Sequence, residues 1–222
     1  MDADLITVPG HRLTGAAIAD TIATLSDTQR QRRFAIAATA GTTNLGIVDE
    51  LAGIADVCER EKLWLHIDGA YGGAALAAPS VRAEFNGIER SDSFIVDPHK
   101  WLFAPFDCCA LLYRDPETAR RAHRQHGDYL EVLYDGVWNP SDYAHHLSRR
   151  ARGLPLWFSL STHGTNAYTE AVEQTLSIAR EAAVLIEAND HLEMVLEQHL
   201  SMSDFGAKIG RPHSIKPGVI TC

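Results

Sequence analysis

The first half of the chain alternates short apolar runs with stretches of helical periodicity. Apolar runs typical of buried strands occupy residues 34–39, 63–67, 93–96 and 108–113. After the first run, Asp49 is expected to cap a helix that places its apolar residues on one face. Those residues are Leu51, Ile54, Ala55 and Cys58. The alternation predicts a three-layer α/β domain with a mainly parallel sheet.

The second half has a different pattern. Residues 123–152 are rich in Tyr, His, Asp and Gly and lack sustained periodicity, so we expect a mobile catalytic loop at about 123–148. Helical spacing returns at Leu154 and predicts one or two long helices, broken near Gly164. The predicted organisation is a domain at 1–152, a helical segment at 153–197 and an atypical, disordered tail at 198–222.

Composition favours an ordinary soluble protein. The 222 residues are 45% hydrophobic and 22% charged, and the net charge of −9 gives no reason to expect a nucleic-acid or anionic-membrane partner. No apolar stretch reaches the length of a membrane span, and the first residues do not resemble a signal peptide. We therefore expect a cytoplasmic protein. Arg149, Arg150 and Arg152 are interpreted as a solvated or ion-paired basic cluster.

The cysteines and histidines give no sign of a metal centre. The four cysteines lack CxxC spacing and are interpreted as reduced thiols. His145 and His146 are adjacent, but acidic or thiol partners at ligand spacing are missing. We therefore expect no metal.

Two residues that carry chemistry follow successive strands. Asp68 ends the run at 63–67, and Lys100 lies just after the run at 93–96, where carboxyl ends of parallel strands meet. A lysine beside the apolar Trp101 can form an imine with an aldehyde, and a carboxylate can keep a pyridine nitrogen protonated. Pyridoxal 5′-phosphate (PLP) requires this pair. The alternatives are a turn-capping aspartate and an ordinary loop lysine.

Further candidates have weaker signals. Thr42 and Thr43 either bind the cofactor's phenolate oxygen or form a plain turn. His99 either contacts phosphate or substrate, or makes a structural hydrogen bond. Tyr129 either delivers a proton to a reacting carbon or anchors a loop.

Several blocks together resemble the group II PLP-dependent amino acid decarboxylases, which include aromatic-L-amino-acid, histidine and glutamate decarboxylases. The blocks occupy residues 40–43, 64–73, 97–102, 106–108 and 149–158. The resemblance covers about residues 5–197. It implies the large domain of PLP fold type I, the aspartate-aminotransferase-like fold, incomplete at both ends.

The resemblance also implies how the cofactor is held. Lys100 would form the Schiff base and Asp68 would pair with the pyridinium nitrogen. Ala70 would pack on the ring, Thr43 would lie near the phenolate oxygen, and Asp97 would belong to the same binding set.

The implied activity is decarboxylation of an L-amino acid to an amine and CO2. His99 would lie beside phosphate and substrate, and Tyr129 would reach the neighbouring subunit of a homodimer and protonate the reacting carbon. Relatives with phenylalanine at the position of Tyr129 tend toward oxidative aldehyde formation, so the tyrosine favours plain decarboxylation.

The chain departs from the family pattern in length, since members are usually about twice as long. Phosphate-binding hydroxyl residues and a ring-stacking histidine are expected before Met1, and the tail after 197 does not match. We therefore expect a truncated product, with a possible frameshift near 198, that binds PLP weakly. Two other interpretations stay open: another fold type I PLP lyase, and a non-catalytic remnant of a decarboxylase.

Overall fold

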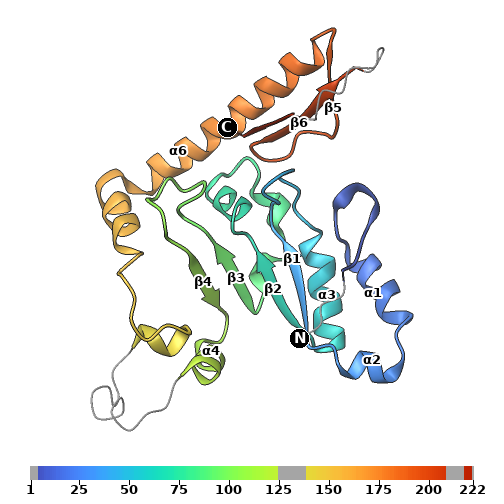
Figure 1. Cartoon of the computed structure of the whole chain (residues 1–222), viewed down its shortest axis with the longest axis vertical. Helices are drawn as coiled ribbons and strands as arrows, with labels where there is room; N and C mark the ends of the chain where they lie inside the picture. The colour runs from blue at the N-terminus through green and yellow to red at the C-terminus, as the bar shows by residue number, and fades with distance from the viewer. Residues whose placement is uncertain (1–4, 125–138, 209–217, 222) are drawn as a thin grey trace.

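A four-stranded sheet forms the centre of the molecule (Figure 1). The computed structural model describes residues 5–124, 139–208 and 218–221. The strands are β1 (Ala35–Thr39), β2 (Trp64–Asp68), β3 (Ser93–Val96) and β4 (Ala110–Tyr113), in that order across the sheet. β1, β2 and β3 are parallel, and β4 runs antiparallel to β3. The predicted mainly parallel α/β sheet is confirmed.

Helices and a second, smaller sheet surround this centre (Figure 1). The α-helices are α1 (Gly15–Ala23), α2 (Asp27–Gln31), α3 (Leu51–Glu61), α4 (Pro116–His123) and α6 (Leu154–Glu187). The 3-10 helices are η1 (Pro9–His11), η2 (Gly72–Ala77), η3 (Arg82–Phe85), η4 (Ile88–Arg90) and η5 (Pro140–Tyr143). The second sheet contains β5 (Leu192–Met194), β6 (Met202–Ala207) and β7 (Gly218–Thr221). In the described ranges, no helix is both long enough and apolar enough to span a membrane.

The two faces of the central sheet differ in burial. Leu65 and Ile67 of β2 lie in the core cluster with Ile54 of α3, so helices cover that face. On the opposite face, Ala37 of β1 and Leu111 of β4 are exposed. The side chains of a strand alternate between faces, so one strand can be buried on one side and open on the other. The described residues therefore form two layers of the expected three.

Asp49 does not cap α3, contrary to the sequence prediction. Glu50 holds the N-cap position, without a side-chain cap. The Asp49 carboxylate instead accepts hydrogen bonds from the Leu13 N–H at 2.8 Å and the Thr39 N–H at 2.6 Å. Burial raises the pKa of this carboxyl, although both hydrogen bonds and the charge of Arg12 lower it. Asp49 thus ties the end of β1 to the N-terminal segment.

The long helix α6 packs against β5 and β6 of the second sheet and against η2 (Figure 1). The break predicted near Gly164 is present, because this glycine has φ 77° and ψ 163° inside the helix. Beyond the break, Val172, Leu176 and Ala179 are fully buried. The apolar face of the second part is thereby packed on the core.

Within the segment 198–222, for which the sequence predicts a disordered tail, residues Met202–Ala207 form strand β6. Strand β6 pairs antiparallel with β5 and β7. Leu200 and Met202 join the core cluster, and the Ser203 hydroxyl donates to the Ala179 carbonyl of α6 at 3.2 Å. The strand forms because its backbone pairs on both sides and its first residues are buried, neither of which is visible as an apolar run in the sequence.

Candidate functional site

The candidate site lies at the carboxyl edge of the parallel strands, where the loops after β1 and β2 come into close contact. Gly72 donates its N–H to the Gly41 carbonyl at 3.3 Å. A Cβ added to Gly72 would be only 2.5 Å from the Gly41 Cα, so the contact requires glycine. Gly41 itself has φ 91°. These two glycines let the loops after β1 and β2 pack closely against each other at the strand ends.

Asp68 is the last residue of β2, and its side chain is exposed at this edge. Its Oδ1 accepts the Ala70 N–H at 3.0 Å, which closes a tight turn. The turn is tied to the end of β3, because Asp97 donates its N–H to the Ala70 carbonyl at 3.0 Å. The backbone therefore brings the loops that carry Asp68 and Lys100 together, as the sequence predicts.

Lys100 lies on a turn that two buried neighbours fix. Pro98 is fully buried and Trp101 is 4% exposed. The Lys100 N–H donates to the Asp97 carbonyl at 2.9 Å, and its Nζ forms an ion pair with Asp97 Oδ2 at 3.1 Å. The Lys100 side chain is 33% exposed, so its amine can be reached from solvent. The apolar setting expected for this lysine comes from the residues on either side of it.

Trp101 anchors the lysine turn to two other elements. Its ring stacks on Tyr71, with centroids 5.3 Å apart and an interplanar angle of 13°. Its Nε1–H donates to Thr175 Oγ1 of α6 at 2.8 Å. A stacked ring pair and a directed hydrogen bond leave little rotational freedom. The position of Lys100 thus depends on α6 and on the turn after β2.

His99 makes the structural hydrogen bond that was one of its two predicted roles. Its Nδ1 lies 2.5 Å from the Cys108 carbonyl oxygen, which can only accept, so Nδ1 carries a proton. In the neutral ring, Nε2 then has the free lone pair. Phe106 meets the imidazole edge-on, with centroids 5.0 Å apart. The ring is held in place while Nε2 keeps its capacity to accept.

The two threonines after β1 have different environments. Thr42 Oγ1 lies 3.3 Å from the backbone nitrogens of Leu45 and Ile47 and accepts from both, which stabilises its own loop. The side chain of Thr43 is exposed. Thr42 therefore has the plain structural role, whereas the side chain of Thr43 is open to solvent.

The basic cluster is largely ion-paired, as interpreted from the sequence. Arg150 and Arg152 both form ion pairs with Asp107, the latter at 3.3 Å. Arg149 donates to the Pro140 carbonyl at 3.0 Å. Tyr129, the predicted proton donor, lies outside the described residues.

No group of three or more His, Cys, Asp or Glu side chains suited to a metal ion occurs in the described part of the chain. The His145 and His146 rings lie 3.8 Å apart. The charge of His145 is the main cause that lowers the pKa of His146.

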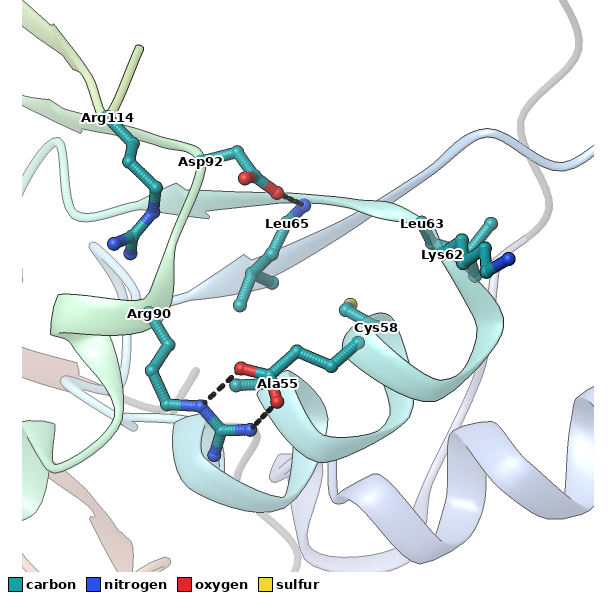
Figure 2. A pocket seen from close by; sticks show the side chains of 9 residues that line it. Ala55, Cys58, Lys62, Leu63, Leu65, Arg90, Asp92 and Arg114 are labelled. Atoms are coloured by element: carbon teal, nitrogen blue, oxygen red, sulfur yellow. Dashed lines mark hydrogen bonds and ion pairs between the residues drawn. The ribbon is translucent and has the colours of Figure 1, made fainter.

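A pocket of about 390 Å³ lies at the opposite end of the sheet from Lys100, between the C-terminal part of α3 and the starts of β2 and β3 (Figure 2). Several of its polar side chains are engaged within the protein. Arg90 pairs with Asp56 and Glu59, and Asp92 accepts the Leu65 N–H at 2.7 Å. Burial is the main cause that raises the pKa of the Cys58 thiol, to about 11. Lys62 and Asp92 also line this pocket, which lies at the starts of the strands, away from the carboxyl edge that carries Asp68 and Lys100.

Comparisons with known proteins agree with this geometry. Residues 5–208 match the family model described as the pyridoxal-dependent decarboxylase conserved domain. The chain belongs to the pyridoxal-dependent decarboxylase family. The match continues past residue 198, where the sequence pattern predicts that the resemblance ends.

The relatives include both sequences and solved structures. An aromatic-L-amino-acid decarboxylase from Bacillus atrophaeus is 34% identical over 181 residues, which cover 80% of this chain and 38% of the relative. The crystal structure of mouse CSAD has a TM-score of 0.82 at 30% identity, covering 90% of this chain and 42% of that one. Oryza sativa TDC, solved with PLP and tryptamine, has a TM-score of 0.81 at 29% identity, covering 88% and 40%. The chain thus spans about two fifths of these relatives, and it has the fold of their PLP-binding large domain.

Sequence reasoning did not foresee two contacts of the lysine turn. One is the Asp97–Lys100 ion pair, which the three-residue spacing within a turn could have indicated. The other is Cys109, whose thiol has its pKa raised to about 11, mainly by burial and then by a hydrogen bond to Asp97. No sequence signal identifies Cys109, because its contact depends on the antiparallel pairing of β4 with β3.

Proposed function

We propose that this protein is a PLP-dependent carboxy-lyase of amino acid metabolism, which converts an L-amino acid to the amine and CO2. The observation that carries the proposal is the position of Lys100 and Asp68 after adjacent parallel strands, in a member of the pyridoxal-dependent decarboxylase family. Similar proteins include an aromatic-L-amino-acid decarboxylase, a cysteine sulfinic acid decarboxylase and a histidine decarboxylase. No comparable observation favours another class of PLP lyase.

The donor set fits PLP. The cofactor offers an aldehyde for a lysine amine and a pyridine nitrogen for a carboxylate, and when bound it draws electrons from the bond that breaks at the substrate's α-carbon. Lys100 presents a primary amine that is 33% exposed. Asp68 presents an exposed carboxylate whose Oδ1 is fixed by the Ala70 N–H. Both groups can therefore be reached by a planar ligand at the edge of the sheet.

The proposed roles of the chain's residues follow from these positions. Lys100 would bind the aldehyde group of PLP covalently, and Asp68 would stabilise the protonated ring nitrogen. Ala70 would lie against the ring, and Thr43 would donate to the phenolate oxygen. His99, held through Nδ1, presents Nε2 toward phosphate or substrate and can exchange a proton there.

One further role rests on the family resemblance. Tyr129 is proposed to donate a proton to the α-carbon in the site of the neighbouring subunit, within a homodimer. The protein is proposed to be cytoplasmic, which agrees with the free cysteines at 58, 108 and 109 in the described chain.

The test combines visible absorbance with chemical trapping. The 222-residue chain is mixed with PLP and scanned for an imine band at about 420 nm, then treated with borohydride and digested for peptide mass spectrometry. We expect a band and a borohydride-fixed adduct on Lys100. Both should disappear in Lys100→Ala and persist in the matched control Lys62→Ala. CO2 release from a panel of carboxyl-labelled L-amino acids then tests the reaction.

The outcomes separate the interpretations. An adduct on Lys100 with CO2 release supports the carboxy-lyase. An adduct without CO2 from any amino acid contradicts decarboxylation by this chain. Equal labelling of wild type and Lys100→Ala contradicts the proposed site and favours a non-catalytic remnant.

A further inference from the structure

The turn that carries Lys100 and the turn that follows Asp68 meet through two buried aromatic rings. Trp101 directly follows Lys100 and is 4% exposed, and Tyr71 lies shortly after Asp68 and is 7% exposed. The two rings are stacked, with centroids 5.3 Å apart. A displacement of one ring would therefore move one turn relative to the other.

The polar atom of each ring is held by a residue that is distant in the sequence. The Tyr71 hydroxyl hydrogen-bonds the hydroxyl of Ser201, which is fully buried just before β6, and it also lies 3.4 Å from the Met202 Sδ. The Trp101 Nε1–H donates to Thr175 Oγ1 of α6 at 2.8 Å. Because a buried polar group is costly to leave without its partner, each bond resists movement of its ring. The C-terminal segment and α6 thus fix the aromatic pair from outside the two turns.

We propose that Tyr71 is a positioning residue that keeps the Lys100 amine in register with the Asp68 carboxylate. It acts through the ring of Trp101, and Ser201 holds it in place. The inference rests on the proposed function, because the register matters for a ligand that uses both groups. Tyr71 acts from the core and need not touch the cofactor.

A ligand that bonds to two groups at once needs both of them at a fixed separation. PLP offers an aldehyde to the lysine amine and a ring nitrogen to the carboxylate. When both protein groups are fixed, the second contact forms within the same complex at a high effective concentration, and looseness in either group lowers that advantage. Removal of a buried hydroxyl that touches neither group is therefore expected to weaken the hold on the cofactor.

Hydrogen exchange of the full chain without cofactor tests the positioning directly. Two backbone N–H groups of the lysine turn, those of Lys100 and Ala104, donate hydrogen bonds within residues 97–104. Mass spectrometry of peptides that span these residues reports how often the bonds open. Tyr71→Phe removes one hydroxyl and keeps the ring, and we expect exchange in this span to become about three- to tenfold faster.

Matched variants separate positioning from a general loss of stability. Ser201→Ala removes the other end of the same hydrogen bond, so it should give the same acceleration, and the double variant should add little to either change. Tyr113→Phe makes the same substitution at the opposite end of the sheet, beside the start of β3, where the Tyr113 hydroxyl lies 3.1 Å from His123 Nε2. This variant should leave exchange at 97–104 unchanged.

The consequence for the cofactor is measured on the same variants. The neutral amine of Lys100 condenses with the aldehyde of PLP to give an imine and water, and borohydride then adds hydride to the imine carbon and makes the bond permanent. Mass spectrometry after digestion gives the ratio of label on Lys100 to label on Lys62, and circular dichroism of the imine band reports how rigidly the ring is held. We expect Tyr71→Phe and Ser201→Ala to lower the ratio about three- to tenfold at limiting PLP, and to lower the dichroism per bound imine.

The two measurements distinguish the outcomes. Unchanged exchange at 97–104 in Tyr71→Phe and Ser201→Ala, or an equal acceleration in Tyr113→Phe, overturns the inference. Faster exchange with an unchanged label ratio and dichroism also overturns it, because the hydroxyl would then stabilise the turn without positioning the amine. A wild-type chain whose Lys100 takes no label above Lys62 contradicts the proposed function, and the exchange data still decide whether Tyr71 holds the lysine turn.

Discussion

Replacing Gly46 by alanine tests whether the C-terminal segment packs against the loop that carries Thr43. Gly46 has φ +71°, and a Cβ there would lie 2.2 Å from the His199 carbonyl oxygen. That carbonyl accepts the Met202 N–H at 3.0 Å, so it cannot move without loss. Gly10 is a matched control, because it has φ +72° and a Cβ there meets nothing within 4 Å.

The two substitutions share one cost and differ in another. An alanine in the left-handed region costs roughly 1–2 kcal/mol, and this applies to both positions. At Gly46 the clash with backbone adds an overpacking cost of about 1–3 kcal/mol, and a weakened hydrogen bond adds about 1 kcal/mol. We therefore expect Gly46→Ala to lower the free energy of unfolding by about 2–4 kcal/mol more than Gly10→Ala.

Urea unfolding followed by tryptophan fluorescence measures the difference, since the chain has four tryptophans. Each kcal/mol corresponds to about 2–4 °C in Tm for a domain of this size. Losses that agree within about 0.5 kcal/mol at the two positions would refute the packing of residues 199–202 on this loop. The loop would then be held without the C-terminal segment.

Two further predictions concern one buried and one half-buried polar group. Asp49→Ala leaves the Leu13 and Thr39 N–H groups without their acceptor. We therefore expect the free energy of unfolding, measured by urea titration, to fall by about 2–4 kcal/mol. An unchanged midpoint would contradict the role of this carboxylate. Burial lowers the pKa of His66 below its ordinary 6.5, so its stabilising contribution is present above pH 6.5 and lost as the pH falls. Tm measured between pH 5 and 8 should therefore fall less on acidification in His66→Gln than in wild type, and parallel curves would contradict this.

The local elements could be predicted because their signals lie within a few residues. The apolar run at 34–39 becomes β1, and the spacing of Leu51, Ile54 and Cys58 becomes the buried face of α3. The break at Gly164 was also predictable, since only glycine readily adopts that backbone conformation inside a helix. Asp68 and Lys100 were predictable as a pair because parallel strands bring their carboxyl ends to one edge.

The sequence by itself thus determined the four strands of the central sheet, the main helices and the identity of the chemical groups at the strand ends. Only the tertiary structure decided what those groups contact. Asp49 accepts hydrogen bonds from Leu13 and Thr39, which are 36 and 10 residues away. Strand β6 forms because it pairs with two strands and buries Met202. The physical reason is the separation in sequence of the residues involved. Periodicity and turn chemistry depend on residues that are near in the sequence, whereas hydrogen-bond partners and burial depend on how distant segments pack.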